Sequence, residues 1–270
     1  MRGLVEKILR ETAWIAGLFG LALFFVTAIL TFVLPQVQGG FDDIFAELPF
    51  AKKMVGALLG TDIGRTLSSQ MLQAMLFVHP VVLTITWSFV ILFGTRVPAG
   101  EIDRGTADVL LSWPLSRTTL FTVESTLCVA GGFWLIAMAW LGHLTMSPTM
   151  PVDMRPRGIE VVFVYVNFFA VYVAVAGTTF LASSLSDRRG RAVAAVAAFL
   201  LFSFLLNFVA PFWEPAKSVD FLSVLTYYRP ATILSESGFP TADVAVLLAI
   251  GAATWTAGGI VFARRDVCTT

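Results

Sequence analysis

Six long stretches without a single Asp, Glu, Lys or Arg constrain this chain more than any other feature of its sequence. Each has 20 to 25 residues, and the six are 13–34, 71–94, 125–146, 161–185, 192–213 and 244–263. A helix of about 20 apolar residues can cross the hydrocarbon core of a bilayer. Strands of a membrane barrel are about half as long and alternate in polarity. We therefore expect an all-α membrane protein, with six transmembrane helices in one domain over residues 1–270.

Composition narrows the class of protein further. Only 13% of the residues are charged and the formal net charge is zero, whereas binding to nucleic acid requires a basic excess that neutralises phosphates. We therefore expect the lipid bilayer, and no nucleic acid, as a partner. Cys128 and Cys268 form neither a disulfide framework nor a metal-binding pattern.

The distribution of Lys and Arg predicts the orientation of the spans. If both termini lie on one side of the membrane, that side holds eleven of the 18 basic residues, including the tight turn at 186–191 and the Arg264-Arg265 pair. Basic residues in short loops stay on the cytoplasmic side. We expect a multi-pass protein of the cell (plasma or inner) membrane with both termini in the cytoplasm.

Three segments outside the spans have amphipathic character. Residues 2–12 place Leu4, Ile8 and other apolar residues on one helical face and charged residues on the other. This pattern is typical of an elbow helix lying in the membrane interface, although a frayed polar leader is the alternative. We expect short amphipathic helices at the outer surface within 35–70. Residues 221–234 are expected to form a short helix that dips into the interface.

The connection between the second and third spans, residues 95–121, is too long for a turn and too apolar in its second half for a solvated loop. Its sequence is TRVPAGEIDRGTADVLLSWPLSRTTLF. Gly105 can break the chain, Thr106 can cap a new helix with Asp108 in its first turn, and Pro114 can end that helix. We expect a charged helical end followed by a short amphipathic coupling helix across the cytoplasmic face.

The same connection carries a resemblance to a known family. The run GEIDRGT at 100–106, followed by LLS at 110–112 and PLSR at 114–117, resembles the signature that follows the second span of type-2 ABC transporter permeases. In that family an E-x-x-x-G-T element precedes L-L-x-x-P-[VL]-S-R. The FARRD sequence at 262–266 is similar to the end of many members. Within the family, the chain is most similar to the subgroup of the nitrous-oxide-reductase maturation permease.

The resemblance implies a membrane permease subunit of an ATP-binding-cassette exporter. Two copies, or one copy and a paralogue, would form the translocation pathway, and separate ABC ATPase subunits would dock below. The coupling region would be 95–121, and the residues assigned to it are Glu101, Asp103, Arg104, Gly105, Thr106, Pro114 and Arg117. Members often carry a lysine where this chain has Glu124, so the charge pairing at the mouth of the third span stays open.

The chain itself lacks the sequence features of an enzyme. A phosphate-binding loop needs Gly-Lys-Ser or Gly-Lys-Thr, and none of the four lysines follows a glycine. ATP hydrolysis is therefore expected in a partner, with no cofactor, metal site or catalytic residue in this chain. No residues are assigned to substrate binding.

Other functions remain as alternatives. A secondary transporter or channel would place ionisable residues at mid-membrane, and a non-transporting assembly subunit could share the same architecture. Taken singly, the charges at 101–117 fit a solvated loop. His79, which precedes Pro80, suggests a kink in the second span. For His79, His143, Asn167 and Asn207, packing between helices is favoured over a functional role.

Overall fold

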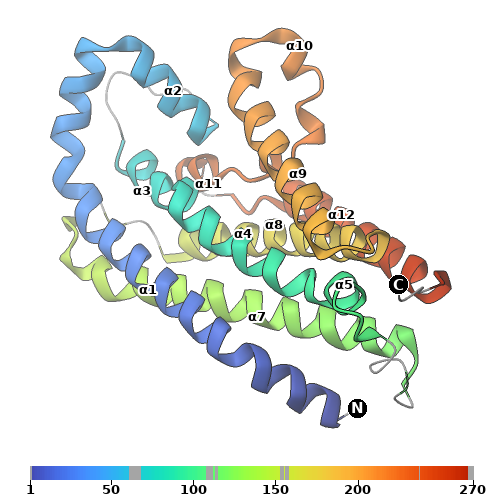
Figure 1. The fold of residues 1–270 in the computed structure, drawn as a ribbon. Helices are drawn as coiled ribbons and strands as arrows, with labels where there is room; N and C mark the ends of the chain where they lie inside the picture. Colours follow the sequence, from blue (N-terminus) through green and yellow to red (C-terminus); the bar gives the residue numbers. More distant parts are fainter. Residues whose placement is uncertain are drawn as a thin grey trace.

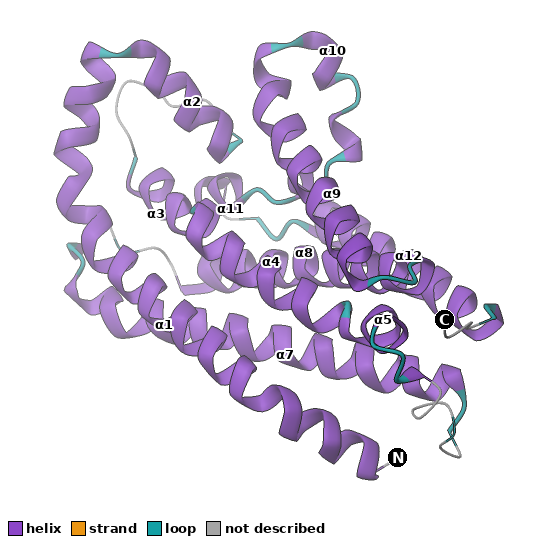
Figure 2. Ribbon diagram, in the orientation of Figure 1, coloured by secondary structure: helices purple, strands orange, loops and turns teal. Residues whose placement is uncertain are grey.

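The computed structural model describes residues 2–60, 68–107, 112, 115–152, 155, 158–236 and 238–266, without the side chains of 39, 41–43, 45, 46 and 49. These residues are overwhelmingly helical, with no strand among them (Figures 1 and 2). Six segments are long and apolar enough to cross a membrane: Arg2–Gln38, Ser69–Gly94, Arg117–Thr149, Gly158–Leu185, Arg189–Phe212 and Thr241–Arg264. Five of these segments contain a predicted stretch completely, and the segment Arg189–Phe212 contains all but the last residue of 192–213. The chain is thus an all-helical protein of the multi-pass membrane class.

The spans alternate in direction, so the bundle has two ends. The proximal end, which carries both chain termini in Figure 1, contains Arg2, Gly94, Arg117, Leu185, Arg189 and Arg264. The distal end contains Gln38, Ser69, Thr149, Gly158, Phe212 and Thr241. Both termini lie at one end of the bundle, as the even number of spans requires.

The helices pack in two close pairs. Helix α1 (Arg2–Glu47) lies along α7 (Arg117–Met146), and α8 (Gly158–Leu185) lies along α12 (Thr241–Arg264). Helix α4 (Pro80–Gly94) contacts α1, α7 and α8, while α9 (Arg189–Val209) packs on α8. Helix α8 is consequently the most buried of the six spans.

Small residues allow α8 and α12 to approach backbone to backbone. A Cβ atom added at Gly177 would lie 2.4 Å from the carbonyl oxygen of Gly251 on α12. Any larger residue would therefore force the two helices apart. Close packing at small residues is the usual way in which membrane helices associate, and Gly177 and Gly251 permit it here.

The first helix differs from its prediction. The separate elbow helix expected at residues 2–12 is not present, because α1 continues without a break from Arg2 through Pro35 to Glu47. No helix-breaking residue lies at the expected junction, and the Thr12 hydroxyl donates a hydrogen bond to the Ile8 carbonyl within the helix. The predicted apolar face exists, but Leu4 and Ile8 are buried within the protein.

The second span is broken at His79, as the sequence predicts. Helix α3 (Ser69–Val78) ends there and α4 begins at Pro80, while the His79 ring nitrogen Nδ1 accepts a hydrogen bond from the Val81 N–H. The bond replaces a helical hydrogen bond that Pro80 interrupts. Of the segment 35–70, residues 35–47 extend α1 and Pro49–Leu59 forms α2, so an amphipathic helix lies where one was expected.

A folded segment precedes the last span at the distal end. It contains η4 (Ala210–Phe212), α10 (Glu214–Lys217), η5 (Asp220–Leu222), η6 (Val224–Tyr227) and α11 (Pro230–Glu236). Helix α11 packs against α3 and α8, and Val224, Leu225, Ile233 and Leu234 are buried. The segment predicted to dip into the interface therefore returns into the protein.

The amide of Asn167 on α8 holds this returning segment. It donates to the Tyr227 carbonyl at 3.0 Å and accepts from the Arg229 N–H at 3.4 Å. His143 is likewise buried, with its Nδ1 atom 3.1 Å from the Thr31 hydroxyl. The packing role favoured for both residues is confirmed, since each joins separate parts of the chain.

Candidate functional site

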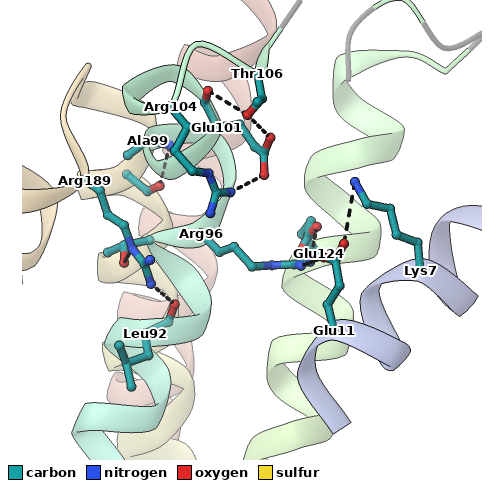
Figure 3. A network of polar contacts seen from close by, with 12 residues as sticks. Lys7, Glu11, Leu92, Arg96, Ala99, Glu101, Arg104, Thr106, Glu124 and Arg189 are labelled. Carbon is teal, nitrogen blue, oxygen red and sulfur yellow. Dashed lines mark hydrogen bonds and ion pairs between the residues drawn. The ribbon is translucent and has the colours of Figure 1, made fainter. Parts of the chain in front are cut away.

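A cluster of charged side chains joins three elements at the proximal end. Arg96 lies in η1 (Arg96–Gly100), an irregular turn after α4. Its guanidinium donates to both carboxylate oxygens of Glu124 on α7, at 2.7 and 2.9 Å. The same guanidinium donates to the carboxylate of Glu11 on α1. Figure 3 shows Arg96 between these two acids. We call Glu11, Arg96 and Glu124 the arginine cluster.

Burial makes the arginine cluster a strong constraint on these helices. The Glu124 side chain is 3% exposed and the Arg96 side chain 14% exposed. A buried charge is costly unless it is paired and hydrogen-bonded, and a guanidinium can engage a carboxylate through two parallel hydrogen bonds. Removing Arg96 would leave the buried Glu124 charge without its partner, whereas removing Glu124 would leave Arg96 paired with Glu11 alone.

The GEIDRGT sequence forms a helix end followed by a tight turn. The short helix α5 (Glu101–Asp103) ends with two backbone hydrogen bonds, from Gly105 N–H to the Ile102 carbonyl and from Thr106 N–H to the Glu101 carbonyl, both 3.0 Å. This pair of bonds defines a Schellman motif. Gly105 has φ +68°, a left-handed conformation that glycine adopts without strain.

Side chains close the same turn. The Thr106 hydroxyl donates to the Glu101 carboxylate at 2.6 Å, and the Arg104 guanidinium pairs with the other carboxylate oxygen (Figure 3). Glu101 thus accepts from both residues that flank Gly105. We call residues 101–106 the Glu101 turn. The element E-x-x-x-G-T has a physical meaning here, because its glutamate, glycine and threonine each stabilise one part of the turn.

Two further contacts attach the chain around the Glu101 turn to the neighbouring spans. The Ala99 N–H donates to the Ser183 hydroxyl of α8 at 3.2 Å, and both residues are buried. Arg189, at the start of α9, donates to the Leu92 carbonyl of α4 at 2.8 Å and to the Thr95 hydroxyl at 3.2 Å. The segment from Thr95 to Thr106 is therefore connected to α1, α4, α7, α8 and α9.

A second group of contacts lies at the ends of other helices. Arg117, in the first turn of α7, donates to the Arg265 carbonyl just after α12. Arg265 donates to the Ser184 carbonyl at 2.9 Å and pairs with Asp187 in the turn between α8 and α9. These contacts hold α7, α8 and α12 together at the proximal end.

The structure brings some of the predicted site residues together and places others apart. The Glu101 turn brings together Glu101, Arg104, Gly105 and Thr106. Asp103 is exposed in α5, and in the described part of the chain its side chain makes no hydrogen bond or ion pair. The Thr106 hydroxyl donates to Glu101, and the helix that Thr106 was predicted to cap would continue from Ala107 into residues that the structure does not describe. Most of that helix, with Asp108 and Pro114, lies outside the described residues.

Arg117 lies apart from the Glu101 turn, among the contacts that join α7 to α12. Helix α7 begins at Arg117, with the Ser116 hydroxyl accepting from the Thr119 N–H at 3.0 Å as its N-cap. Residues 117–121, which were predicted as part of the 95–121 connection, consequently belong to the third span. Helix α7 thus begins within the predicted 95–121 region, and Leu120 and Phe121 in its first turns are buried.

Sequence reasoning missed Glu11, Arg96 and Arg189 as functional candidates. All three were treated only as charges on a predicted cytoplasmic side. A usable signal was present for Glu124, an acid where the family resemblance implies lysine. An acid immediately beside a predicted span needs a cation, and Arg96, beside the end of the preceding span, is a candidate for that role.

The chemistry of the site is structural rather than nucleophilic. Its members are carboxylates and guanidinium groups already engaged with one another, and no group of His, Cys, Asp or Glu in the described residues could hold a metal ion. Such an arrangement can transmit movement between a surface turn and several helices. No protein-family model matches the chain. No curated protein matches it either.

Proposed function

We propose that this chain is the membrane permease subunit of an ATP-binding-cassette exporter. The chain, paired with a second copy or a paralogue, forms the translocation pathway. A separate ATPase subunit docks at the proximal end, which faces the cytoplasm of a cell membrane. The single observation that carries the proposal is the Glu101 turn, an ordered surface element whose attached segment contacts five helices.

The geometry favours coupling over a simple solvated loop. A loop that only satisfied the positive-inside rule would need no fixed side-chain geometry. Here Glu101 is committed to Thr106 and Arg104, and the backbone leading to it is bonded to Ser183. A force applied to this turn by a docked partner would pass to α7 through Arg96 and to α8 through Ala99.

The arginine cluster also bears on the main alternative. A secondary transporter needs an ionisable group inside the membrane that can exchange its proton or ion. Helix α7 extends the third span back to Arg117 and so includes Glu124, but both oxygens of this carboxylate accept from Arg96. Glu124 is therefore engaged in a fixed pair between helices, which favours a structural role.

Co-purification tests the proposal directly. The tagged full-length chain, extracted from its native membrane in mild detergent, should bring down an ATPase with a Gly-Lys-Ser or Gly-Lys-Thr phosphate loop. ATP hydrolysis by that partner should change when it is reconstituted with the chain in liposomes. The absence of any stably associated ATPase would contradict the proposal.

Variants of α5 separate coupling from assembly. Glu101→Ala removes the acceptor for both Thr106 and Arg104, whereas Asp103→Ala removes an exposed acid from the same short helix and is the matched control. We expect Glu101→Ala to reduce chain-dependent ATP hydrolysis about tenfold or more, because it removes the charge-assisted hydrogen bonds from Thr106 and Arg104 that close the turn. Equal activity of the two variants, with normal membrane insertion, would exclude a coupling role for the turn.

A further inference from the structure

A cavity whose wall includes several charged residues lies at the distal end, far from the arginine cluster and the Glu101 turn. Its volume is about 350 Å³, within the range of roughly 300–1,000 Å³ typical of small-ligand sites. The lining comes from the end of α2, the end of α9 and the folded segment before α11. The charged and amide residues in its wall are Asn207, Lys217, Asp220 and Arg229.

The wall combines two cations with one carboxylate. In the described part of the chain, the Lys217 ammonium forms an ion pair with Glu214 at 3.6 Å, and this pair is largely exposed, so it is weak. Arg229 donates through Nε to the Thr226 carbonyl at 2.8 Å, which positions its guanidinium. The Asp220 carboxylate and the Asn207 amide make no hydrogen bond or ion pair in the described part of the chain. The cavity can therefore offer cationic donors and a free carboxylate to one ligand.

Hydrogen bonds from side chains to backbone groups hold this wall in shape. The Thr226 hydroxyl donates to the Asp220 carbonyl at 2.8 Å, and the Tyr227 hydroxyl donates to the Phe221 carbonyl at 3.1 Å. On the other side, Asn167 binds the backbone at Tyr227 and Arg229. The charged side chains thus extend from a segment that is ordered independently of any ligand.

The depth of the cavity matches a membrane interface. The fifth span, Arg189–Phe212, has 24 residues, which makes it roughly 36 Å long at a rise of 1.5 Å per residue. A bilayer core is about 30 Å thick, so the end of this span reaches the headgroup layer. Ala210 and Pro211, which line the cavity, lie at that end.

Exposed apolar side chains surround the same segment. They are Phe212, Trp213, Phe221 and Leu222, each about half exposed or more. Aromatic residues are favoured at the membrane–water interface, where their rings meet both lipid and water. A ligand bound in the cavity would therefore meet charged and amide groups in the cavity wall and exposed apolar side chains on the surrounding segment.

We infer that this cavity binds a phospholipid of the distal leaflet, whose headgroup carries a phosphate and a primary ammonium. Arg229 and Lys217 bind the phosphate, since guanidinium and ammonium groups are the usual phosphate ligands in proteins. Asp220 and Asn207 accept hydrogen bonds from the ammonium. The acyl chains lie along the exposed aromatic residues. This inference stands independently of the transport function.

Native mass spectrometry of the delipidated full-length chain in detergent tests the site. The chain is titrated with dioleoyl phosphatidylethanolamine, and Lys217→Gln and Arg229→Gln are compared with Lys53→Gln, an exposed lysine on α2 outside the cavity. We expect Arg229→Gln to weaken lipid binding roughly tenfold, the loss of one charge-assisted hydrogen bond. Lys217→Gln should have a smaller effect and Lys53→Gln none. Equal binding by all four proteins would overturn the inference.

Two further titrations identify the ligand class. Dioleoyl phosphatidylcholine has no ammonium N–H, so it should bind more weakly than the ethanolamine lipid, and Asp220→Asn should remove this preference. An unchanged preference in Asp220→Asn would overturn the assignment of the ammonium. Inorganic phosphate should compete only at concentrations far above those of the lipid. Competition at equal concentrations would show a site for free anions and overturn the lipid assignment.

Discussion

At the proximal end, charged side chains join neighbouring helices, whereas at the distal end an amide and aromatic rings hold a returning segment in place. Arg96 connects α1, η1 and α7 through two carboxylates. Asn167 and Tyr228 instead bind backbone groups, and Tyr228 stacks on Phe168 with ring centroids 5.5 Å apart. The first arrangement links separate helices through paired charges, while the second closes the bundle around one segment.

This difference follows from the groups that need partners at each end of the bundle. The proximal end contains basic connections, so acids beside the helices find cationic partners. The distal end contains a longer segment whose irregular backbone is buried, and its N–H and C=O groups need partners within the protein. Substitutions at each end should therefore differ in magnitude and in the part of the chain that they affect.

The largest effect is expected from Arg96→Ala. Breaking a buried ion pair costs about 3–5 kcal/mol, because the remaining charge is left without a partner. The thermal unfolding midpoint in detergent should fall by on the order of 10 °C. Arg264→Ala, which removes an exposed arginine at the same end, should leave the midpoint unchanged. The double variant Arg96→Met, Glu124→Leu should recover most of the loss.

Asn167→Ala tests the distal end with the next largest effect. The variant leaves the Tyr227 carbonyl and the Arg229 N–H without their partner, at a cost of about 2 kcal/mol. Hydrogen exchange should accelerate in residues 214–236 and not at the proximal end. Asn207→Ala is the control, since Asn207 makes no hydrogen bond in the described part of the chain. Uniform acceleration across both ends would contradict the separation of the two regions.

Tyr228→Phe should have a smaller effect at the same end. It removes the hydrogen bond from the phenol to the Phe77 carbonyl, 3.1 Å away, and retains the stacked ring. We expect a loss of about 1 kcal/mol in the free energy of unfolding. Burial raises the pKa of the Tyr228 phenol well above its ordinary value, so the phenol stays protonated. The difference between the two proteins should therefore be constant from pH 6 to pH 9.

Gly105→Ala should have an effect on stability no larger than that of Tyr228→Phe, and the effect should remain confined to the Glu101 turn. A side chain at φ +68° costs roughly 1 kcal/mol in backbone strain, although an added Cβ meets no atom within 4 Å. Gly190→Ala is the matched control, because Gly190 lies at the same end, has space for a Cβ and has no positive φ. Equal unfolding midpoints for the two variants would show that the turn does not need its left-handed residue.

The sequence predicted the spans well and their connections less well. Charge-free length is a local property, so all six spans were found, and Pro80 correctly indicated the break at His79. The elbow helix failed because an amphipathic face does not reveal whether lipid or protein covers it. Leu4 and Ile8 are covered by protein. The extension of α7 back to Arg117 was missed because Glu124 ended the charge-free stretch.

The candidate site was predicted in part. Glu101, Gly105 and Thr106 are close in sequence, and their spacing alone is enough to form a turn. The arginine cluster draws its members from residues 11, 96 and 124, and a single sequence contains no spacing that indicates such a contact. The sequence contains the two acids and the arginine, but it does not indicate that they pair with one another.

By itself, the sequence determined a six-span helical membrane protein with both termini at one end, because apolar length and the number of crossings are properties of the chain alone. Only the tertiary structure decided that Glu124 pairs with Arg96, that residues 2–12 belong to the first span, and that the segment at 210–236 returns into the bundle. Each depends on which helix lies beside which, and this is settled by packing at small residues and by the need to pair every buried charge and backbone group.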